Sequence, residues 1–343
     1  MDRPTFPSLA VSFRLGLAFH ALNNEGTEGT NVLYPRQVEV AGRIYDGISG
    51  AIQRRHVLEN LVGIARREGL PLLPFSEELE PDRWPLGIRY VAKTDLDTQT
   101  LDRSILYRAT RKALERCVVL DAGGGLAAWK EGSTRDVVIE EKWEGKLASV
   151  GDAPNVKRDS VFDLAWMISE APQEKALTQH AAYRPSGEQS LYHVTMRSNV
   201  YGGVFRAALH RLGTDDYWHL QEDAPREILK PQDKLRRMQA LVEAFFEFLT
   251  SPRGAKEAAW CPHLFLLEGA AVFRKNGTAP FVSPIKVDLS SPEAPVKPRE
   301  DFLSALQALA REGEIEVFIF RGPEEAFGVR DQILKRLEES HAG

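Results

Sequence analysis

The chain has 343 residues, of which 43% are hydrophobic and 27% charged, a balance typical of a globular protein with a sizeable core. Its formal net charge of -5 argues against a simple nucleic-acid coat protein, for which a basic total is expected, but it is compatible with a local basic patch. Because no apolar run could span a membrane, the first residues do not read as a signal peptide and only two cysteines are present, we expect a cytoplasmic protein with no membrane contact and no disulfide framework.

The first predicted element is a strand over residues 11–19. Its apolar side chains alternate with polar or small ones, which is the period of a strand with one buried face. The apolar positions are Val11, Phe13, Leu15, Leu17 and Phe19. A polar loop that contains glycine, residues 22–29, follows this strand.

A helix is predicted to begin near Ile48 and to end at Gly69. Its apolar residues recur at helical spacing, and Ser49 or Asp46 can cap its first turn. The preceding loop and the helix start both present backbone N–H groups, and the helix dipole adds positive charge there. Between residues 36 and 67 there are six arginines and three acidic residues. This part of the chain is therefore predicted to bind an anion.

Residues 67–150 read as an inserted segment of mixed structure. Residues 70–85 are rich in proline and acid and are expected to be irregular, whereas residues 104–116 have helical spacing. Asp121 is followed by three glycines in a Gly-x-Gly-x-x-Ala pattern, the outline of a dinucleotide fingerprint. That fingerprint needs a long helix after it and a surrounding βαβ unit. The sequence indicates neither, so we do not expect a dinucleotide cofactor.

Residues 155–187 are predicted to form a long hairpin with its tip at residues 172–175. Later elements are a strand over 192–200, a turn at Gly202-Gly203, a strand over 204–212, a helix over 230–250, a strand over 263–273, a helix over 302–310, a strand over 315–320 and a helix over 329–337. The order strand, helix, insertion, strand, strand, helix, strand is that of an RRM-like (ferredoxin-like) α+β fold. In such folds helices cover one face of the sheet, and RNA readers commonly use the other.

The loop after the first strand carries a resemblance to a known family. Residues 22–29 read Leu-Asn-Asn-Glu-Gly-Thr-Glu-Gly, Pro35-Arg36 follows, and Ile48-Ser49-Gly50 opens the helix. This combination resembles the DevR-type Cascade backbone proteins, the Cas-seven family of type I CRISPR systems. The family has Ser where this chain has Ala21. The match is specific over the first 60 residues, moderate over residues 155–212, and holds in outline elsewhere.

The resemblance implies a palm made of residues 1–66 and 190–343, a finger insertion at 67–150 and a thumb hairpin at 151–189. It also implies a non-enzymatic subunit that binds the CRISPR guide RNA (crRNA). Copies would assemble head to tail along the crRNA and present it for pairing with target DNA. The implied protein partners are the Cas-five subunit, the large and small Cascade subunits and a recruited helicase–nuclease. Neither a cofactor nor a metal ion is implied.

Candidate RNA-binding residues lie in two parts of the chain. Those of the first loop and helix are Asn23, Asn24, Gly26, Thr27, Arg36, Ser49, Gly50, Arg54, Arg55 and His56. Those of the hairpin and the following strand are Lys157, Arg158, Gln179, His180, Arg197, Ser198 and Asn199. Asn and Thr donate hydrogen bonds, Arg and Lys bring charge, and Gly allows close approach to a phosphate chain. The alternative is an ordinary turn with solvated charges.

Three apolar residues are candidates for a wedge between bases, which the family's thumb inserts at regular intervals. They are Phe162, Trp166 and Met167. A wedge must stand on a protruding element, because unstacking two bases has to be offset by new contact. The alternative is that each of the three packs beneath the hairpin.

Two other functions remain open on the sequence. One is an enzyme that acts on nucleotides or RNA, with Asp46 as the acid to watch, although no catalytic motif is present and helix capping also explains this residue. His56-x-x-Glu59 alone cannot make a metal site. The other is an RNA-binding module that acts as a monomer.

Overall fold

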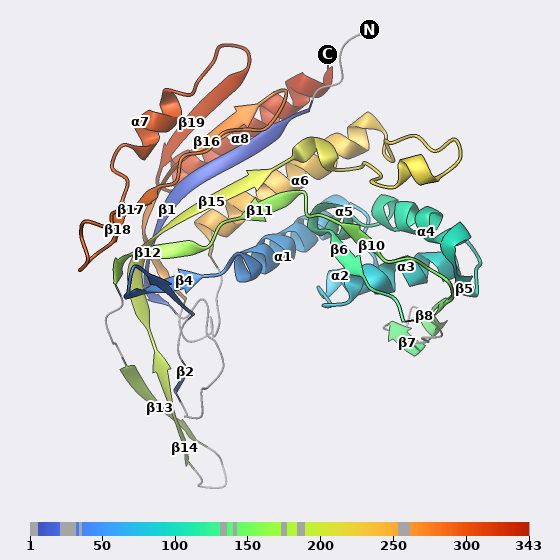
Figure 1. Ribbon diagram of the computed structural model, residues 1–343, viewed down its shortest axis with the longest axis horizontal. Helices are drawn as coiled ribbons and strands as arrows, with labels where there is room; N and C mark the ends of the chain where they lie inside the picture. The colour runs from blue at the N-terminus through green and yellow to red at the C-terminus, as the bar shows by residue number, and fades with distance from the viewer. Residues whose placement is uncertain are drawn as a thin grey trace.

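The computed structural model describes residues 6–20, 32–33, 36–130, 136–139, 143–172, 177–183, 189–252 and 261–342. It has a mixed α+β body built on one large antiparallel sheet, from which a β-hairpin and a helical insertion project (Figure 1). Four of the predicted RNA-binding residues lie outside the described residues: Asn23, Asn24, Gly26 and Thr27.

The main sheet runs in the order β19-β16-β1-β15-β12-β4-β3, and β11 also pairs with β15. Its strands are β1 (Ser8–His20), β3 (Gln37–Val40), β4 (Arg43–Ile48), β11 (Phe162–Leu164), β12 (Met167–Pro172), β15 (Arg197–Ala207), β16 (His263–Arg274) and β19 (Ile315–Arg321). The long strand β1 lies in the middle, between β15 and β16. The predicted buried positions Val11, Phe13, Leu15 and Leu17 are confirmed. Phe19 is 57% exposed, which corrects its predicted place on the buried face, and Ala10 and Ser12 on the opposite face are buried as well.

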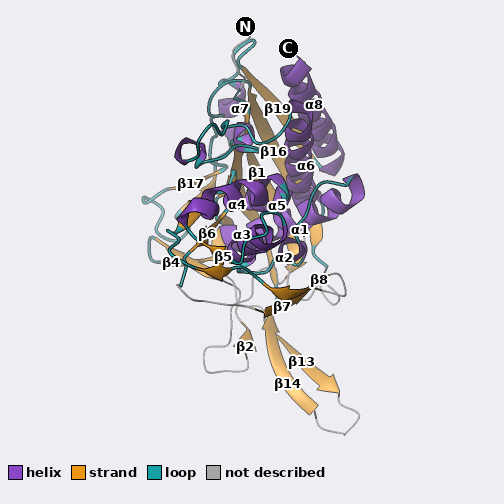
Figure 2. Ribbon diagram, turned by 90° about the vertical axis from the view of Figure 1, so that its right-hand side faces the viewer, coloured by secondary structure: helices purple, strands orange, loops and turns teal. Residues whose placement is uncertain are grey.

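Three helices cover one face of this sheet (Figure 2). They are α1 (Gly50–Glu68), α6 (Pro231–Thr250) and α8 (Pro323–Ala342), and α6 packs between the other two. The apolar side of β1 faces them, and Phe245 of α6 stacks on Phe205 of β15 with ring centroids 3.8 Å apart. The predicted helices at residues 48–68 and 230–250 are therefore confirmed, because each has a continuous apolar stripe for this sheet.

The other face of the sheet is partly covered as well. Residues 279–310 fold back over it with β17 (Ile285–Val287), β18 (Val296–Pro298) and α7 (Phe302–Gln307). Phe302 packs against Ala10 and Val272, which are the small and apolar residues on the outward side of β1 and β16. The expectation of a free second face is therefore wrong for this part of the sheet.

The insertion is more helical than its sequence indicated. Its helices are α2 (Pro74–Glu77), α3 (Arg83–Thr94), α4 (Arg103–Glu115) and α5 (Val118–Gly123), and its short strands are β5 (Thr100–Leu101), β6 (Gly125–Ala127), β7 (Asp136–Ile139), β8 (Trp143–Lys146), β9 (Ser149–Val150) and β10 (Val156–Arg158). The predicted helix at residues 104–116 is confirmed as α4. Helix α3 was missed because Pro85 reads as a helix breaker, whereas it stands in the first turn, where proline is tolerated.

The projecting hairpin consists of β13 (Leu177–Tyr183) and β14 (Gln189–Thr195), with β2 (Val32–Leu33) parallel to β14. The predicted hairpin over residues 155–187 is therefore wrong in its bounds. The strands that pair are residues 177–183 and 189–195, from Leu177 opposite Thr195 to Tyr183 opposite Gln189. Residues 162–172 instead join the main sheet as β11 and β12, while β10 pairs with β6 of the insertion.

The predicted turn at Gly202-Gly203 is also wrong, because β15 runs straight through both glycines. A Cβ at Gly202 would lie 2.5 Å from Ile285, and one at Gly203 would lie 2.5 Å from the Phe13 ring. Both glycines therefore serve close packing on the two sides of the sheet, which is the other common role of glycine in a strand.

Candidate nucleic-acid interface

The start of α1 is held tightly against the strand segment that follows β11. Ser49 caps the helix by accepting a hydrogen bond from the Ile52 N–H at 3.4 Å, as predicted. A Cβ at Gly50 would lie 2.5 Å from the Leu164 carbonyl oxygen, so this position accepts only glycine without a shift. Both predicted residues therefore fix the position of the helix start, and the Ser49 side chain is buried in that role.

Trp166 and Arg36 lie beside this helix start. The Trp166 side chain is 42% exposed, and its ring lies against Gly47 of β4. The Arg36 guanidinium lies 5.5 Å from the centre of the Trp166 ring, within cation–π range. An exposed aromatic face next to a cation is the pairing that single-stranded nucleic acid uses, with a base on the ring and a phosphate on the charge.

The other two wedge candidates are buried. Phe162 is 2% exposed and Met167 is 1% exposed, and both belong to the main core beneath the sheet. A side chain that fills the core cannot insert between bases, so the structure corrects the expectation for Phe162 and Met167. Of the three candidates only Trp166 is available at the surface.

Three consecutive residues of α1 have three different environments. The Arg55 guanidinium is exposed and donates to Glu59 at 2.9 Å, and the His56 ring nitrogen Nδ1 lies 3.0 Å from the same carboxylate. Arg54 instead turns towards Gly123 of α5, with its Nη2 atom 3.8 Å from the position of a Cβ there. Burial lowers the pKa of Arg54, and the charge of Asp163 opposes that shift.

Arg158 is buried in an ion-pair network and is withdrawn as an RNA-binding residue. Its Nη2 donates to Asp121 Oδ1 at 2.6 Å, while Arg237 Nη1 of α6 donates to Asp121 Oδ2 at 2.7 Å. All three side chains are almost fully buried. The neighbouring Lys157 side chain is exposed and remains available to a ligand.

Arg197 is likewise buried and paired, which corrects its predicted role. Its Nε donates to Asp46 Oδ1 at 3.0 Å, and Asp46 is itself buried. The same pairing removes Asp46 as a free catalytic acid. Ser198 is exposed and accepts from the Phe19 N–H at 3.0 Å, and Asn199 is half-buried.

The described structure places Gln179 and His180 on β13 of the projecting hairpin, opposite His193 and Tyr192 of β14. Their side chains are outside the described part of the structure. The two residues therefore lie on the projecting hairpin, whereas the Arg36–Trp166 pair lies in the body.

The three glycines after Ala122 do not form an open phosphate cradle. Their Cβ positions are occupied by neighbours: the Leu58 side chain at Gly123, the Arg158 backbone at Gly124 and the Trp84 side chain at Gly125. This packing disfavours a dinucleotide site. It places Trp84 of α3, and beside it Arg83, at the glycine turn that also contacts Leu58 of α1. Both residues belong to the stretch that the sequence predicted to be irregular.

Within the described ranges, no three His, Cys, Asp or Glu side chains gather in a way that suits one metal ion. Among the described helices, none combines the length and the apolar character that a membrane span requires.

Comparison with known proteins gives a family match and similarities to solved structures. The model of the family described as CRISPR-associated negative auto-regulator DevR/Csa2 matches residues 11–290. One similar solved chain, from a CRISPR RNA-guided surveillance complex, has a TM-score of 0.46 at 9% identity, and the match covers 95% of this chain and 99% of that one. Another, from a CRISPR RNA-guided surveillance complex in a pre-nicking state, has a TM-score of 0.41 at 11% identity and coverages of 77% and 78%. No curated protein sequence matches the chain.

Proposed function

The chain belongs to the DevR/Csa2 family, the non-catalytic Cas-seven type backbone subunits of type I CRISPR surveillance complexes, and from this premise we propose how it holds RNA. Several copies assemble head to tail along one crRNA, and each copy binds the sugar–phosphate chain without reading its sequence. The bases are left for pairing with target DNA, so the guide supplies the specificity. The proposed protein partners are the Cas-five subunit and the large and small Cascade subunits.

The sheet order supports an RRM-like palm. The elements β1, α1, β12, β15, α6 and β16 occur in this order in the chain, with the short strands β2 to β4, the insertion, β10, β11 and the hairpin between some of them. Their strands lie side by side in the order β16-β1-β15-β12. This is the strand order of a ferredoxin-like core with both helices on one face. We assign the insertion at residues 67–150 to the finger and the β13–β14 hairpin to the thumb.

The pair formed by the exposed Trp166 ring and the half-buried Arg36 is the observation that carries the RNA-binding proposal. It lies where β4 enters α1, at the root of the thumb, and combines a flat apolar ring with a cation. Trp166 stacks on a base or separates two bases, and Arg36 with Arg55 and Lys157 neutralises phosphates. Ser198 and Asn199 add polar contacts, and Gln179 and His180 extend the contact along the thumb.

The decisive experiment measures the mass of the complex formed on single-stranded RNAs of increasing length. The number of bound copies is expected to rise in steps as the RNA is lengthened, because each copy covers a fixed stretch and contacts the next copy. Arg36→Gln with Trp166→Ala is expected to shift every step to higher protein concentration. A single copy on every RNA, whatever its length, would favour the monomeric module instead.

A further inference from the structure

Arg54 of α1 and Arg83 of α3 lie near the junction of the body with the finger, and in the described part of the chain each has a buried nitrogen without a partner. Among the described residues no hydrogen-bond partner is found for Arg54 Nε, for Arg83 Nε or for the indole Nε1 of Trp84. Arg83 Nη1 donates to the Glu80 carbonyl oxygen at 3.1 Å. Buried donors of this kind are uncommon, and each calls for a ligand or a physical explanation.

The glycine turn after Ala122 brings these groups together from two helices. The Arg54 Nη2 atom lies 3.8 Å from the Cβ position of Gly123, and the Trp84 Cβ atom lies 2.6 Å from that of Gly125. Arg83 adjoins Trp84 at the start of α3. One side of the cluster therefore belongs to α1 of the body, and the other side belongs to the finger.

Among the described residues, no carboxylate forms an ion pair with Arg54 or Arg83. Burial lowers the pKa of Arg54, and the pKa of Arg83 is lowered first by burial and then by the charge of Arg54. The acid that acts on Arg54 is Asp163, whose carboxylate already accepts from Arg206 at 2.9 Å. Two guanidinium groups thus repel one another in a partly desolvated place.

The other buried arginines of the body are arranged differently. Arg158 and Arg237 share the Asp121 carboxylate, and Arg197 has Asp46. Burying a charge without a counter-charge is strongly unfavourable, so a structure that keeps two such arginines together needs an anion from outside.

We propose that Arg54, Arg83 and the indole N–H of Trp84 bind a phosphate group, and that in the assembled complex this group belongs to the backbone of the guide RNA. The guanidinium forks and the indole supply only donors, which suits the oxygens of a phosphate. The second half of this proposal rests on the proposed function. It extends the RNA path from the Arg36–Trp166 pair along α1 to the finger, so that the finger grips the strand as well as the palm.

The phosphate site is tested with inorganic phosphate on protein freed of nucleic acid. The melting temperature in potassium phosphate is compared with that in potassium chloride at equal ionic strength, because a ligand that binds only the folded state raises it. The wild-type protein is expected to show a phosphate-specific rise that saturates. Arg54→Gln and Arg83→Gln are expected to abolish it, and Trp84→Phe, which keeps an aromatic ring but removes the indole N–H with part of the ring, is expected to weaken it.

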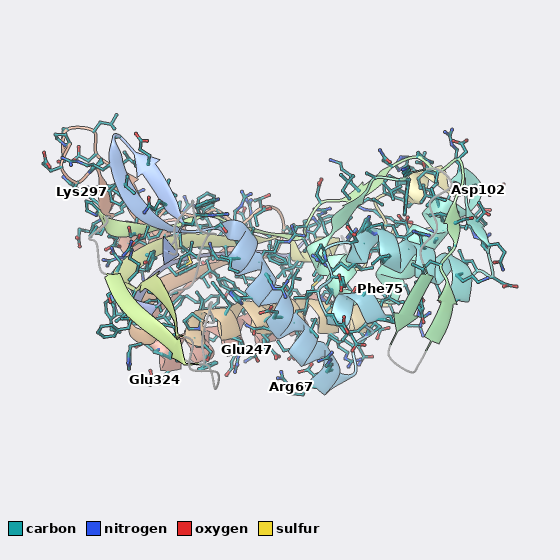
Figure 3. All side chains as sticks on the ribbon, turned by 90° about the horizontal axis from the view of Figure 1, so that it is seen from below. Arg67, Phe75, Asp102, Glu247, Lys297 and Glu324 are labelled. Atoms are coloured by element: carbon teal, nitrogen blue, oxygen red, sulfur yellow. The ribbon has the colours of Figure 1, made fainter. Side chains whose placement is uncertain are left out.

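Arg67→Gln is the matched control. Arg67 lies at the other end of α1 with an exposed guanidinium near Glu247, as Figure 3 shows, and it donates to Glu243 at 3.2 Å. This variant is expected to keep the full phosphate effect. A wild-type protein without any phosphate-specific rise would overturn the site, and so would Arg54→Gln and Arg83→Gln variants that retain the rise. The wild-type protein alone decides whether a phosphate-specific rise occurs, so this part of the test does not depend on whether a variant folds.

The source of the phosphate is tested by the salt dependence of binding to single-stranded RNA. Arg83→Gln is expected to reduce the slope of log affinity against log salt by about 0.7, the value for one phosphate contact on a single strand, while Arg67→Gln leaves it unchanged. If Arg83→Gln abolishes the phosphate effect but keeps the slope, the site holds a phosphate from another source and the second half is wrong. If the wild type binds no RNA at all, the proposed function fails, and the phosphate measurement still judges the site.

Discussion

Asp121 accepts hydrogen bonds from three separate parts of the chain. Its two carboxylate oxygens accept hydrogen bonds from the guanidinium groups of Arg158 of β10 and Arg237 of α6, and one of them also accepts from the backbone N–H of Gly213 at 2.9 Å. The arginines also donate to backbone carbonyls, so the network satisfies groups of the finger and the body together. A carboxylate in this position stabilises the fold because it neutralises two buried cations.

Asp121→Ala is therefore expected to destabilise the protein by about 3–5 kcal/mol, since it leaves the buried Arg237 without a counter-charge and Arg158 with Asp216 alone. Urea-induced unfolding followed by circular dichroism measures this change. The control is Asp163→Ala, which breaks the exposed pair with Arg206 and is expected to change stability by at most about 1 kcal/mol. Similar losses of stability in Asp121→Ala and Asp163→Ala would contradict the stabilising role of Asp121.

His20 is a buried neutral imidazole at the end of β1. Its Nε2 lies 2.8 Å from the Tyr201 hydroxyl oxygen, and the Arg197–Asp46 pair is close by. Burial and, to a lesser extent, the charge of Arg197 lower the pKa of His20 from 6.5 to about 3. The unfolded chain therefore binds a proton between these two values and the folded chain does not.

This difference predicts that the free energy of unfolding is highest above pH 6.5 and falls as the pH is lowered towards 3, by up to about 1.4 kcal/mol per pH unit from His20. Burial raises the pKa of Asp46, which contributes in the opposite direction. Unfolding curves at pH 7, 6 and 5 measure the slope, and His20→Gln is expected to make it shallower. Parallel slopes for the two proteins would refute the role of His20.

At the level of elements, the chain between β11 and β12 explains why one wedge candidate survives. Phe162 and Met167 sit in the strands that flank this connection and point into the core, while Trp166 stands between the strands and remains at the surface. The neighbouring Gly47 has no side chain, which leaves room for the indole.

Trp166→Ala is expected to weaken RNA binding by about 1–3 kcal/mol, the usual contribution of one base stacked on an aromatic ring. The salt slope of binding is expected to stay the same, because no charge is removed. Trp218→Ala is the control, since Trp218 is 44% exposed but lies on the far loop before α6. Fluorescence anisotropy with labelled RNA measures both; equal losses would argue against a specific stacking position.

The elements with a clear period were predictable from the sequence, and those set by packing were not. The apolar stripe identifies α1 and the alternation of side chains identifies β1, because each of these elements packs one face on the core. Gly202 and Gly203 were misread because the sequence does not reveal that Ile285 and Phe13 press against them. The roles of Arg158 and Arg197 escaped for the same reason, since their carboxylate partners are distant in sequence.

On the scale of the whole molecule, the thumb hairpin and the finger project from one body, and α1 runs between them (Figures 1 and 3). The groups proposed to contact RNA follow this helix from Trp166 at its start to Arg83 at the finger. With a net charge of -5, the chain can attract a polyanion only through such a local path.

Because these contacts are to phosphates and ring faces, affinity is expected to be nearly independent of RNA sequence. Two unrelated single strands of equal length and low self-pairing are compared under the same salt, as RNA affinities depend on it. We expect dissociation constants that agree within about threefold, which is well under 1.4 kcal/mol. A tenfold preference for one strand would show that base edges are read directly.

The network around Asp121 also limits how this protein can be engineered. Asp121 lies in the finger, but one of its two cationic partners, Arg237, belongs to α6 of the body. The finger is therefore not a self-contained module, and a chimera that grafts in the finger of a distant relative would strand Arg237 without its anion. Such a transplant has to carry an acidic residue at position 121, or the recipient loses the ion pair that joins the finger to α6.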